Sequence, residues 1–175
     1  MTIVVCPLSH VPAQVAAHKP DRIISLLDPG TGFPEVGYGA RHLRLSFHDV
    51  DRAEDWEIAP NMEHMRELIA FTRGWQSDKP LLIHCFAGIS RSTASAFIAA
   101  CALNPDTDER DIARALRTAS PDARPNPSLI ALADDALGRG GTLRKGFADI
   151  YGNWEVSPLT ENQPFTLHSR YGGGG

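Results

Sequence analysis

The residues with the clearest chemical potential lie between positions 81 and 92, which read LLIHCFAGISRS. The apolar start predicts a buried strand that delivers His84 and Cys85. Five residues then lead to Arg91 and Ser92, which open a predicted helix. Backbone N–H groups of such a tight loop can converge on one anion, and the N-terminal end of the following helix adds positive potential. The pattern therefore predicts an anion cradle beside a thiol.

Each residue type in this segment has a chemical use. The positive field of the cradle favours the thiolate form of Cys85, which is the form that acts as a nucleophile. Gly88 permits backbone conformations that other residues resist, and the guanidinium of Arg91 can bind two phosphate oxygens. The Ser92 hydroxyl can donate to the sulfur when the sulfur leaves. We expect His84 to act indirectly, through a hydrogen bond to the loop or the cysteine backbone, because adjacent strand side chains point to opposite faces.

The sequence HCFAGISRS matches the H-C-x5-R-[ST] loop of the cysteine-dependent protein tyrosine phosphatases and most resembles their dual-specificity branch. A small bacterial-type tyrosine phosphatase is the nearest picture. The resemblance implies a metal-free, two-step reaction through a phosphocysteine, with no cofactor, in the α/β fold of that family. It also implies a phosphate-binding loop made of Phe86, Ala87, Gly88, Ile89, Ser90 and Arg91.

The loop composition bears on the substrate. A phosphoinositide phosphatase of this family is expected to carry lysines in its loop, whereas this chain has Phe86 and Ile89. Phosphotyrosine in a protein or peptide is therefore the favoured substrate, and phosphoserine or phosphothreonine is accepted if the pocket is shallow. Phe86 and Ile89 either pack or form the rim of the pocket.

The resemblance further implies an aspartic acid that protonates the leaving oxygen. Asp49 lies 36 positions before Cys85, just after a predicted strand, where the family places this acid. Asp51 and Asp55 are alternatives for the same role. The family's tryptophan-proline-aspartate triplet does not occur in this sequence.

A second, weaker match lies downstream of the loop. Ser120-Pro121 followed by Pro125-Asn126 resembles the family's loop in which an asparagine braces the phosphate loop. Asn126 is also suited to cap a helix, because it precedes a proline at the first helical position. Both roles are compatible.

The elements that must position these residues can be predicted from periodicity. Four short runs, several of them nearly continuous in apolar residues, predict strands of a sheet covered on both faces, at 2–8, 22–27, 42–47 and 81–84. Five segments with apolar residues near a helical period predict helices at 11–18, 62–75, 92–103, 108–118 and 127–137. Asp106, Thr107 or Asp108 supplies a cap oxygen for the fourth of these helices. The order is mostly βαβ, so we predict an α/β fold with a central, mostly parallel sheet flanked by helices.

The domain organisation follows from the same pattern. We expect residues 1–140 to form a single catalytic domain. Glycines and sparse periodicity from Gly138 onward predict an extended C-terminal extension over 141–175, which packs on the domain in part through Phe147, Trp154 or Phe165, or is partly disordered. The turn-rich segment 28–34 lacks the spacing of a dinucleotide-binding loop and is read as a connector.

Composition limits the class of protein. The 175 residues, 42% hydrophobic and 22% charged, match one globular domain and argue against a disordered or coiled-coil chain. A formal charge of −4 without a basic stripe gives no sign of nucleic-acid or anionic-membrane binding. No stretch approaches 18 apolar residues, so no membrane span is expected. The oligomeric state cannot be read from these features.

The cysteines and histidines bear on the cellular compartment and on metal binding. Three cysteines without a C-x-x-C pair, namely Cys6, Cys85 and Cys101, favour a reducing, cytoplasmic compartment over a disulfide framework. The seven histidines show no recognised metal-ligand spacing, so no metal site is expected.

Two other functions stay open beside phosphomonoester hydrolysis. A phosphate-recognition module would keep the cradle and lack turnover, but Cys85, Arg91 and Ser92 are all intact. A sulfurtransferase also uses a cysteine at the start of an anion-binding loop. The arginine after five intervening residues and the acidic segment upstream favour phosphate chemistry over that alternative.

Overall fold

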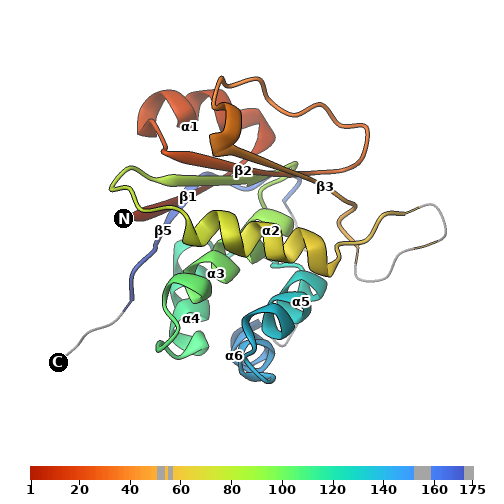
Figure 1. Cartoon of the computed structure of the whole chain (residues 1–175), viewed down its shortest axis with the longest axis vertical. Helices are drawn as coiled ribbons and strands as arrows, with labels where there is room; N and C mark the ends of the chain where they lie inside the picture. Colours follow the sequence, from red (N-terminus) through yellow and green to blue (C-terminus); the bar gives the residue numbers. More distant parts are fainter. Residues whose placement is uncertain (51–53, 55–56, 152–158, 172–175) are drawn as a thin grey trace.

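The computed structural model describes residues 1–50, 54, 57–151 and 159–171, and in it the strands form one sheet in the order β3-β2-β4-β1-β5. β1, β2, β3 and β4 are parallel, and β5 pairs antiparallel with β1 at one edge (Figure 1). The predicted α/β fold with a central, mostly parallel sheet is confirmed. The strands are β1 (Thr2–Pro7), β2 (Arg22–Leu27), β3 (His42–Ser46), β4 (Leu81–Cys85) and β5 (Phe165–His168).

Helices cover both faces of this sheet, which explains why the strands are nearly continuous in apolar residues. α1 lies on one face and the later helices lie on the other (Figure 1). None of the described helices is long and apolar enough to span a lipid bilayer. The helices are α1 (Val11–His18), α2 (Met62–Arg73), α3 (Arg91–Leu103), α4 (Glu109–Ala119), α5 (Pro127–Leu137) and α6 (Thr142–Tyr151), with short 3-10 turns η1 (Leu8–His10) and η2 (Gly39–Arg41).

The first four strands and first five helices occur where the sequence predicts them, with ends that agree within two residues. Two predicted helix caps are also confirmed. Asp108 Oδ1 accepts a hydrogen bond from Arg110 N at 2.9 Å, and Asn126 Oδ1 accepts one from Leu129 N at 3.1 Å. Each cap satisfies one of the backbone donors that a helix start leaves unpaired.

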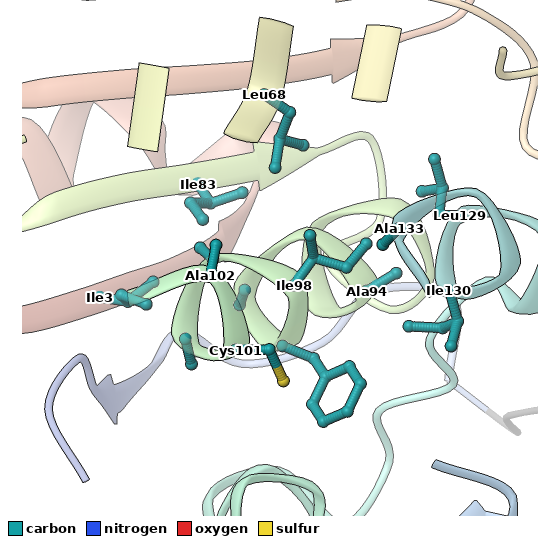
Figure 2. Packing of buried hydrophobic residues seen from close by; sticks show 14 of the residues in the cluster. Ile3, Leu68, Ile83, Ala94, Ile98, Cys101, Ala102, Leu129, Ile130 and Ala133 are labelled. Carbon is teal, nitrogen blue, oxygen red and sulfur yellow. The ribbon is translucent and has the colours of Figure 1, made fainter. Parts of the chain in front are cut away.

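Helix α3 is the central support of the larger core. All of its residues from Arg91 to Ala102 are buried, and its many alanines and serines let neighbouring elements approach closely. Figure 2 shows Ala94 and Ile98 of α3 between Ile83 of the sheet and the side chains of α5. A helix start fixed in this way gives the loop that precedes it a rigid anchor.

The segment after Gly138 differs from the predicted extended tail, because it contains helix α6 and strand β5. Phe147 of α6 and Leu167 of β5 are buried in the main core, and Phe165 packs against it. The helix was hard to predict because Gly146 lowers helix propensity in its middle, and β5 has only four residues. Trp154 lies outside the described residues.

Candidate active site

The candidate site lies where the parallel strands end. Cys85 is the last residue of β4, Asp28 follows the neighbouring β2, and Asp49 comes three residues after the end of β3. Parallel strands bring their carboxyl ends to one edge of a sheet, which is where α/β proteins bind ligands. These three residues line one cavity of about 390 Å³ together with Phe86, Ala87, Ile89, Ser90, Arg91, Arg124 and Leu159.

The loop at the centre of this cavity is held from outside through its carbonyl groups. Every carbonyl from Phe86 to Ser90 accepts a hydrogen bond from another part of the chain. The donors are Leu8 N to Phe86 O (3.0 Å), Asn162 N to Ala87 O (2.9 Å), Asn162 Nδ2 to Gly88 O (3.1 Å), Arg124 N to Ile89 O (2.9 Å) and Ala94 N to Ser90 O (3.0 Å), with the Thr93 hydroxyl bonded to the last two oxygens as well.

This arrangement determines where the loop's N–H groups point. The C=O and N–H of a planar trans peptide unit point in opposite directions. Because the five carbonyls point outward, the N–H groups of residues 87–91 turn to the inside of the loop. Gly88 shows this directly, since its N–H donates to Cys85 Sγ at 3.2 Å. The predicted anion cradle therefore has the required backbone geometry.

Gly88 is needed at its position for two reasons. Its φ is +72°, in the left-handed region that side-chain-bearing residues avoid. A Cβ added there would also lie 2.8 Å from the backbone nitrogen of Pro7, which is closer than real contacts allow. The loop thus packs directly on the end of β1.

Cys85 points into the buried base of the cradle. Its sulfur lies 3.1 Å from Ser92 Oγ and accepts the N–H of Gly88. When the sulfur is a thiolate, both neighbours act as donors and stabilise the negative charge. Ser92 therefore lies where the leaving-sulfur role predicted for it requires.

Arg91 is buried, with 4% of its side chain exposed, and is held by one of its two terminal nitrogens. Nη1 donates to Asp28 Oδ1 at 2.8 Å and to the carbonyl of Phe47 at 2.8 Å. Nε makes no hydrogen bond to a described residue and lies 3.8 Å from Asp49 Oδ2. A buried donor without a partner is costly, and an anion in the cavity would satisfy it.

Asp49 lies beside the loop and is itself held in place. Its Oδ1 accepts hydrogen bonds from Ser90 Oγ at 2.7 Å and from Asn126 Nδ2 at 2.8 Å. Asn126 bonds to Asp49 and to its own helix, while Asn162 Nδ2 donates to the Gly88 carbonyl of the loop. The alternative acids Asp51 and Asp55 lie outside the described residues.

His84 belongs to a buried chain of hydrogen-bonded polar side chains, on the face of the sheet opposite to the one that Cys85 faces. Ser25 Oγ lies 2.6 Å from His42 Nε2 and 2.5 Å from His84 Nε2, and His84 Nδ1 lies 3.4 Å from the carbonyl oxygen of Cys85. If His84 Nδ1 donates to that carbonyl, its Nε2 must accept from Ser25, and His42 must then donate to Ser25. Burial lowers the pKa of both histidines to about 4, so both are neutral near pH 7.

Four residues at the site were not identified from the sequence. Asp28 lies in the segment interpreted as a connector, although its place directly after a buried strand is a usable signal. Arg124 and Leu159 line the cavity, and Asn162 contacts the loop carbonyls, but no local pattern indicates these contacts. The sequence brings the cysteine, arginine and serine together because they are close along the chain, whereas these contacts depend on the tertiary fold.

Sequence comparison agrees with this geometry. A family model described as protein-tyrosine phosphatase matches residues 46–123, which include Asp49 and the whole cradle. Over this segment the chain is similar to the protein-tyrosine phosphatases. No curated protein sequence matches the chain.

Solved structures show that this chain has the fold of dual-specificity-like phosphatases. DUSP15 is 22% identical, with 89% of this chain and 94% of that chain covered and a TM-score of 0.54. The human tyrosine phosphatase-like serine/threonine/tyrosine-interacting protein is 19% identical, with coverages of 79% and 92% and a TM-score of 0.60. PTPMT1 in complex with PI(5)P is 14% identical, with coverages of 78% and 90% and a TM-score of 0.56.

Proposed function

We propose that this protein hydrolyses phosphomonoesters through a phosphocysteine intermediate and that its substrates are proteins or peptides bearing phosphotyrosine. The observation that carries the proposal is the arrangement around Cys85. Its sulfur lies at the base of a loop whose N–H groups point inward, beside a buried Arg91 whose Nε donates no hydrogen bond to a described residue. A reducing, cytoplasmic compartment suits this chemistry, because the thiol must stay free.

In the first step, the Cys85 thiolate attacks the phosphorus, an S–P bond forms, and the bond from phosphorus to the leaving oxygen breaks. The inward N–H groups and Arg91 bind the phosphoryl oxygens as charge redistributes in the transition state. Asp49 gives its proton to the leaving oxygen through Oδ2, the oxygen that does not bond to Ser90 and Asn126.

In the second step, water attacks the phosphorus of the phosphocysteine. The Asp49 carboxylate takes the proton from that water, and the S–P bond breaks to release inorganic phosphate and the thiolate. Ser92 stabilises the leaving sulfur by donating its hydroxyl hydrogen, since the two atoms are 3.1 Å apart. His84 acts as a positioning residue through the Cys85 carbonyl.

The cavity mouth supports an aromatic substrate. Phe86 is 60% exposed and Leu159 is 39% exposed, although large apolar side chains are usually buried. Both line the cavity around the cradle. An apolar rim above a phosphate site suits the ring of phosphotyrosine better than the hydroxyl-rich ring of an inositol phosphate.

The proposal can be tested with three substrates at equal concentration. These are a phosphotyrosyl peptide, the same peptide with phosphoserine, and PI(5)P in mixed micelles. We expect the phosphotyrosyl peptide to have the highest kcat/KM, and the Cys85→Ser variant to turn over none of the three. Preference for PI(5)P would contradict the proposed substrate class. Phosphate binding without turnover by the wild-type protein would indicate a recognition module, and cyanide-dependent thiocyanate formation from thiosulfate would indicate a sulfurtransferase.

A further inference from the structure

We propose that Asn162, from the C-terminal segment, is a positioning residue that holds the middle of the phosphate cradle in its anion-binding conformation. Asn162 lies 39 residues beyond the end of the family match at 123. The proposal rests on the proposed function to the extent that the cradle binds phosphate, and it does not depend on which ester is hydrolysed.

Asn162 contacts two successive carbonyls of the loop with different groups. Its backbone N–H donates to Ala87 O at 2.9 Å, and its side-chain Nδ2 donates to Gly88 O at 3.1 Å. The same Nδ2 also donates to Ser120 Oγ at 2.9 Å, and Oδ1 accepts the N–H of Gln163 at 2.9 Å. With 5% of its surface exposed, Asn162 is fully engaged by the protein.

The peptide unit between Gly88 and Ile89 is the one that depends on the Asn162 side chain. When Gly88 O points outward to Nδ2, the N–H of Ile89 points inward to the anion. Glycine has more accessible backbone conformations than any other residue, so its own peptide unit needs an external contact to hold its orientation. Other carbonyls of the loop are held by backbone groups of η1 and α3. The Gly88 carbonyl is held by a side chain.

The position of Asn162 is itself fixed from both directions along the chain. On one side, Glu161 Oε1 accepts a hydrogen bond from Ser9 Oγ at 2.8 Å and lies 3.4 Å from His10 Nδ1. On the other side, β5 pairs with β1. The C-terminal segment is therefore docked on the same η1 turn whose Leu8 N–H holds Phe86 O.

The chain contains a matched control for Asn162. Asn104 is 7% exposed, donates from Nδ2 to two oxygens (Ala100 O and Ser169 O), and accepts the N–H of Tyr171 at Oδ1. It also ties the C-terminal segment to the domain, but its acceptors Ala100 O and Ser169 O lie outside the loop. Asn162→Leu and Asn104→Leu each delete an equivalent buried amide without changing charge.

The readout is protection of Cys85 from iodoacetamide by inorganic phosphate, which reports anion affinity without requiring turnover. We expect the phosphate affinity of Asn162→Leu to fall by roughly 10-fold or more, because a buried carbonyl that loses its donor reorients the cradle. Asn104→Leu should keep wild-type phosphate affinity, while thermal melting shows a comparable loss of stability in both variants. The kcat/KM of Asn162→Leu should fall with the phosphate affinity.

Equal phosphate affinities in the two leucine variants would overturn the proposal, since Asn162 would then have only a structural role. If Asn162→Leu does not fold, the smaller pair Asn162→Ser and Asn104→Ser is judged by the same criterion. Wild-type protein that binds phosphate but hydrolyses no ester would contradict the proposed function while leaving the Asn162 comparison measurable. Wild-type protein that phosphate does not protect would overturn both.

Discussion

Asp28 and Asp49 follow neighbouring strands of the sheet, β2 and β3, and both contact the guanidinium of Arg91. Asp28 makes a close hydrogen bond of 2.8 Å to Nη1, next to the carbonyl of Phe47. Asp49 lies 3.8 Å from Nε and is instead held by Ser90 and Asn126. The first contact fixes the arginine, and the second places a carboxyl group beside Nε at the cavity.

The comparison shows that two aspartates at the same edge of a parallel sheet can have different roles. Both aspartates are delivered by the same topology, so their roles follow from what their oxygens contact. Asp28 uses its carboxylate to orient a cation, and that role requires an acceptor. Asp49 has one oxygen held by donors and one that faces the cavity, and the role proposed for it requires a proton. Substitutions should separate these roles through their dependence on the leaving group.

Arg91→Lys should have the largest effect among these substitutions, because it removes the group that both aspartates contact. A lysine supplies a point charge and cannot reproduce the planar fork that binds two phosphoryl oxygens. We expect kcat/KM to fall by roughly 10²-fold or more, in line with the loss of a transition-state contact. Steady-state kinetics with aryl phosphates would show this, and retention of most activity would mean that Arg91 is structural.

Asp49→Asn should lower kcat for a phosphotyrosyl peptide by roughly 10² to 10⁴, the usual contribution of a positioned proton donor. The loss should shrink for aryl phosphates with good leaving groups. Asp51→Asn and Asp55→Asn are the controls and should be mild. A mild Asp49→Asn together with a leaving-group-dependent loss in either control would assign the acid to that neighbour.

Asp28→Ala should have a smaller effect of a different kind. Releasing Nη1 removes one charge-assisted hydrogen bond that is partly exposed, so we expect kcat/KM to fall by roughly 10-fold. The loss should be the same for good and poor leaving groups, because orientation of Arg91 matters equally to both. A series of substituted aryl phosphates measures this directly. A loss that grows with poorer leaving groups would instead make Asp28 a proton donor.

Low pH changes both the reaction rates and the stability of the fold. The two pH dependences must therefore be measured separately. Burial lowers the pKa of His42 and His84 to about 4, whereas an unfolded histidine titrates near its ordinary value of about 6.5. Between these values the unfolded state binds more protons, so the free energy of unfolding falls as the pH falls. We expect a loss of roughly 2 kcal/mol per histidine between pH 7.5 and pH 5.

Urea unfolding at the two pH values and constant ionic strength checks this expectation. His42→Gln should show a shallower dependence on pH, because one buried histidine no longer titrates. An unfolding free energy that is unchanged between pH 7.5 and pH 5 would contradict the assignment of two buried neutral histidines.

What the sequence predicts here is mostly what depends on short stretches of chain. The cradle from Cys85 to Ser92 is bounded by a strand and a helix with clear periodicity, so its residues are recognised together. The positions of β1 to β4 along the chain and the caps at Asp108 and Asn126 follow from equally local patterns. Asp49 stays a prediction for the acid, because the family resemblance places that acid just after this strand.

What the sequence does not predict depends on contacts between distant parts of the chain. Asp28 reaches Arg91 across 63 positions, and Asn162 reaches Gly88 across 74. In the sequence, the first stands in a turn-rich stretch with a proline and glycines, and the second stands before a four-residue strand. Neither position has a local pattern that reveals its partner. Asn126 was expected to brace the phosphate loop, and its contact with Asp49 likewise depends on the tertiary arrangement.

The most direct test of the account is to trap the covalent intermediate. Wild-type protein is mixed with excess para-nitrophenyl phosphate, quenched in acid within the first turnovers and digested, and the peptide that contains Cys85 is examined by mass spectrometry. We predict a phosphoryl group on the sulfur of Cys85, and no phosphorylated peptide from the Cys85→Ser variant. A phosphoryl group on another residue of the wild-type protein, or full turnover by Cys85→Ser, would contradict the phosphocysteine mechanism.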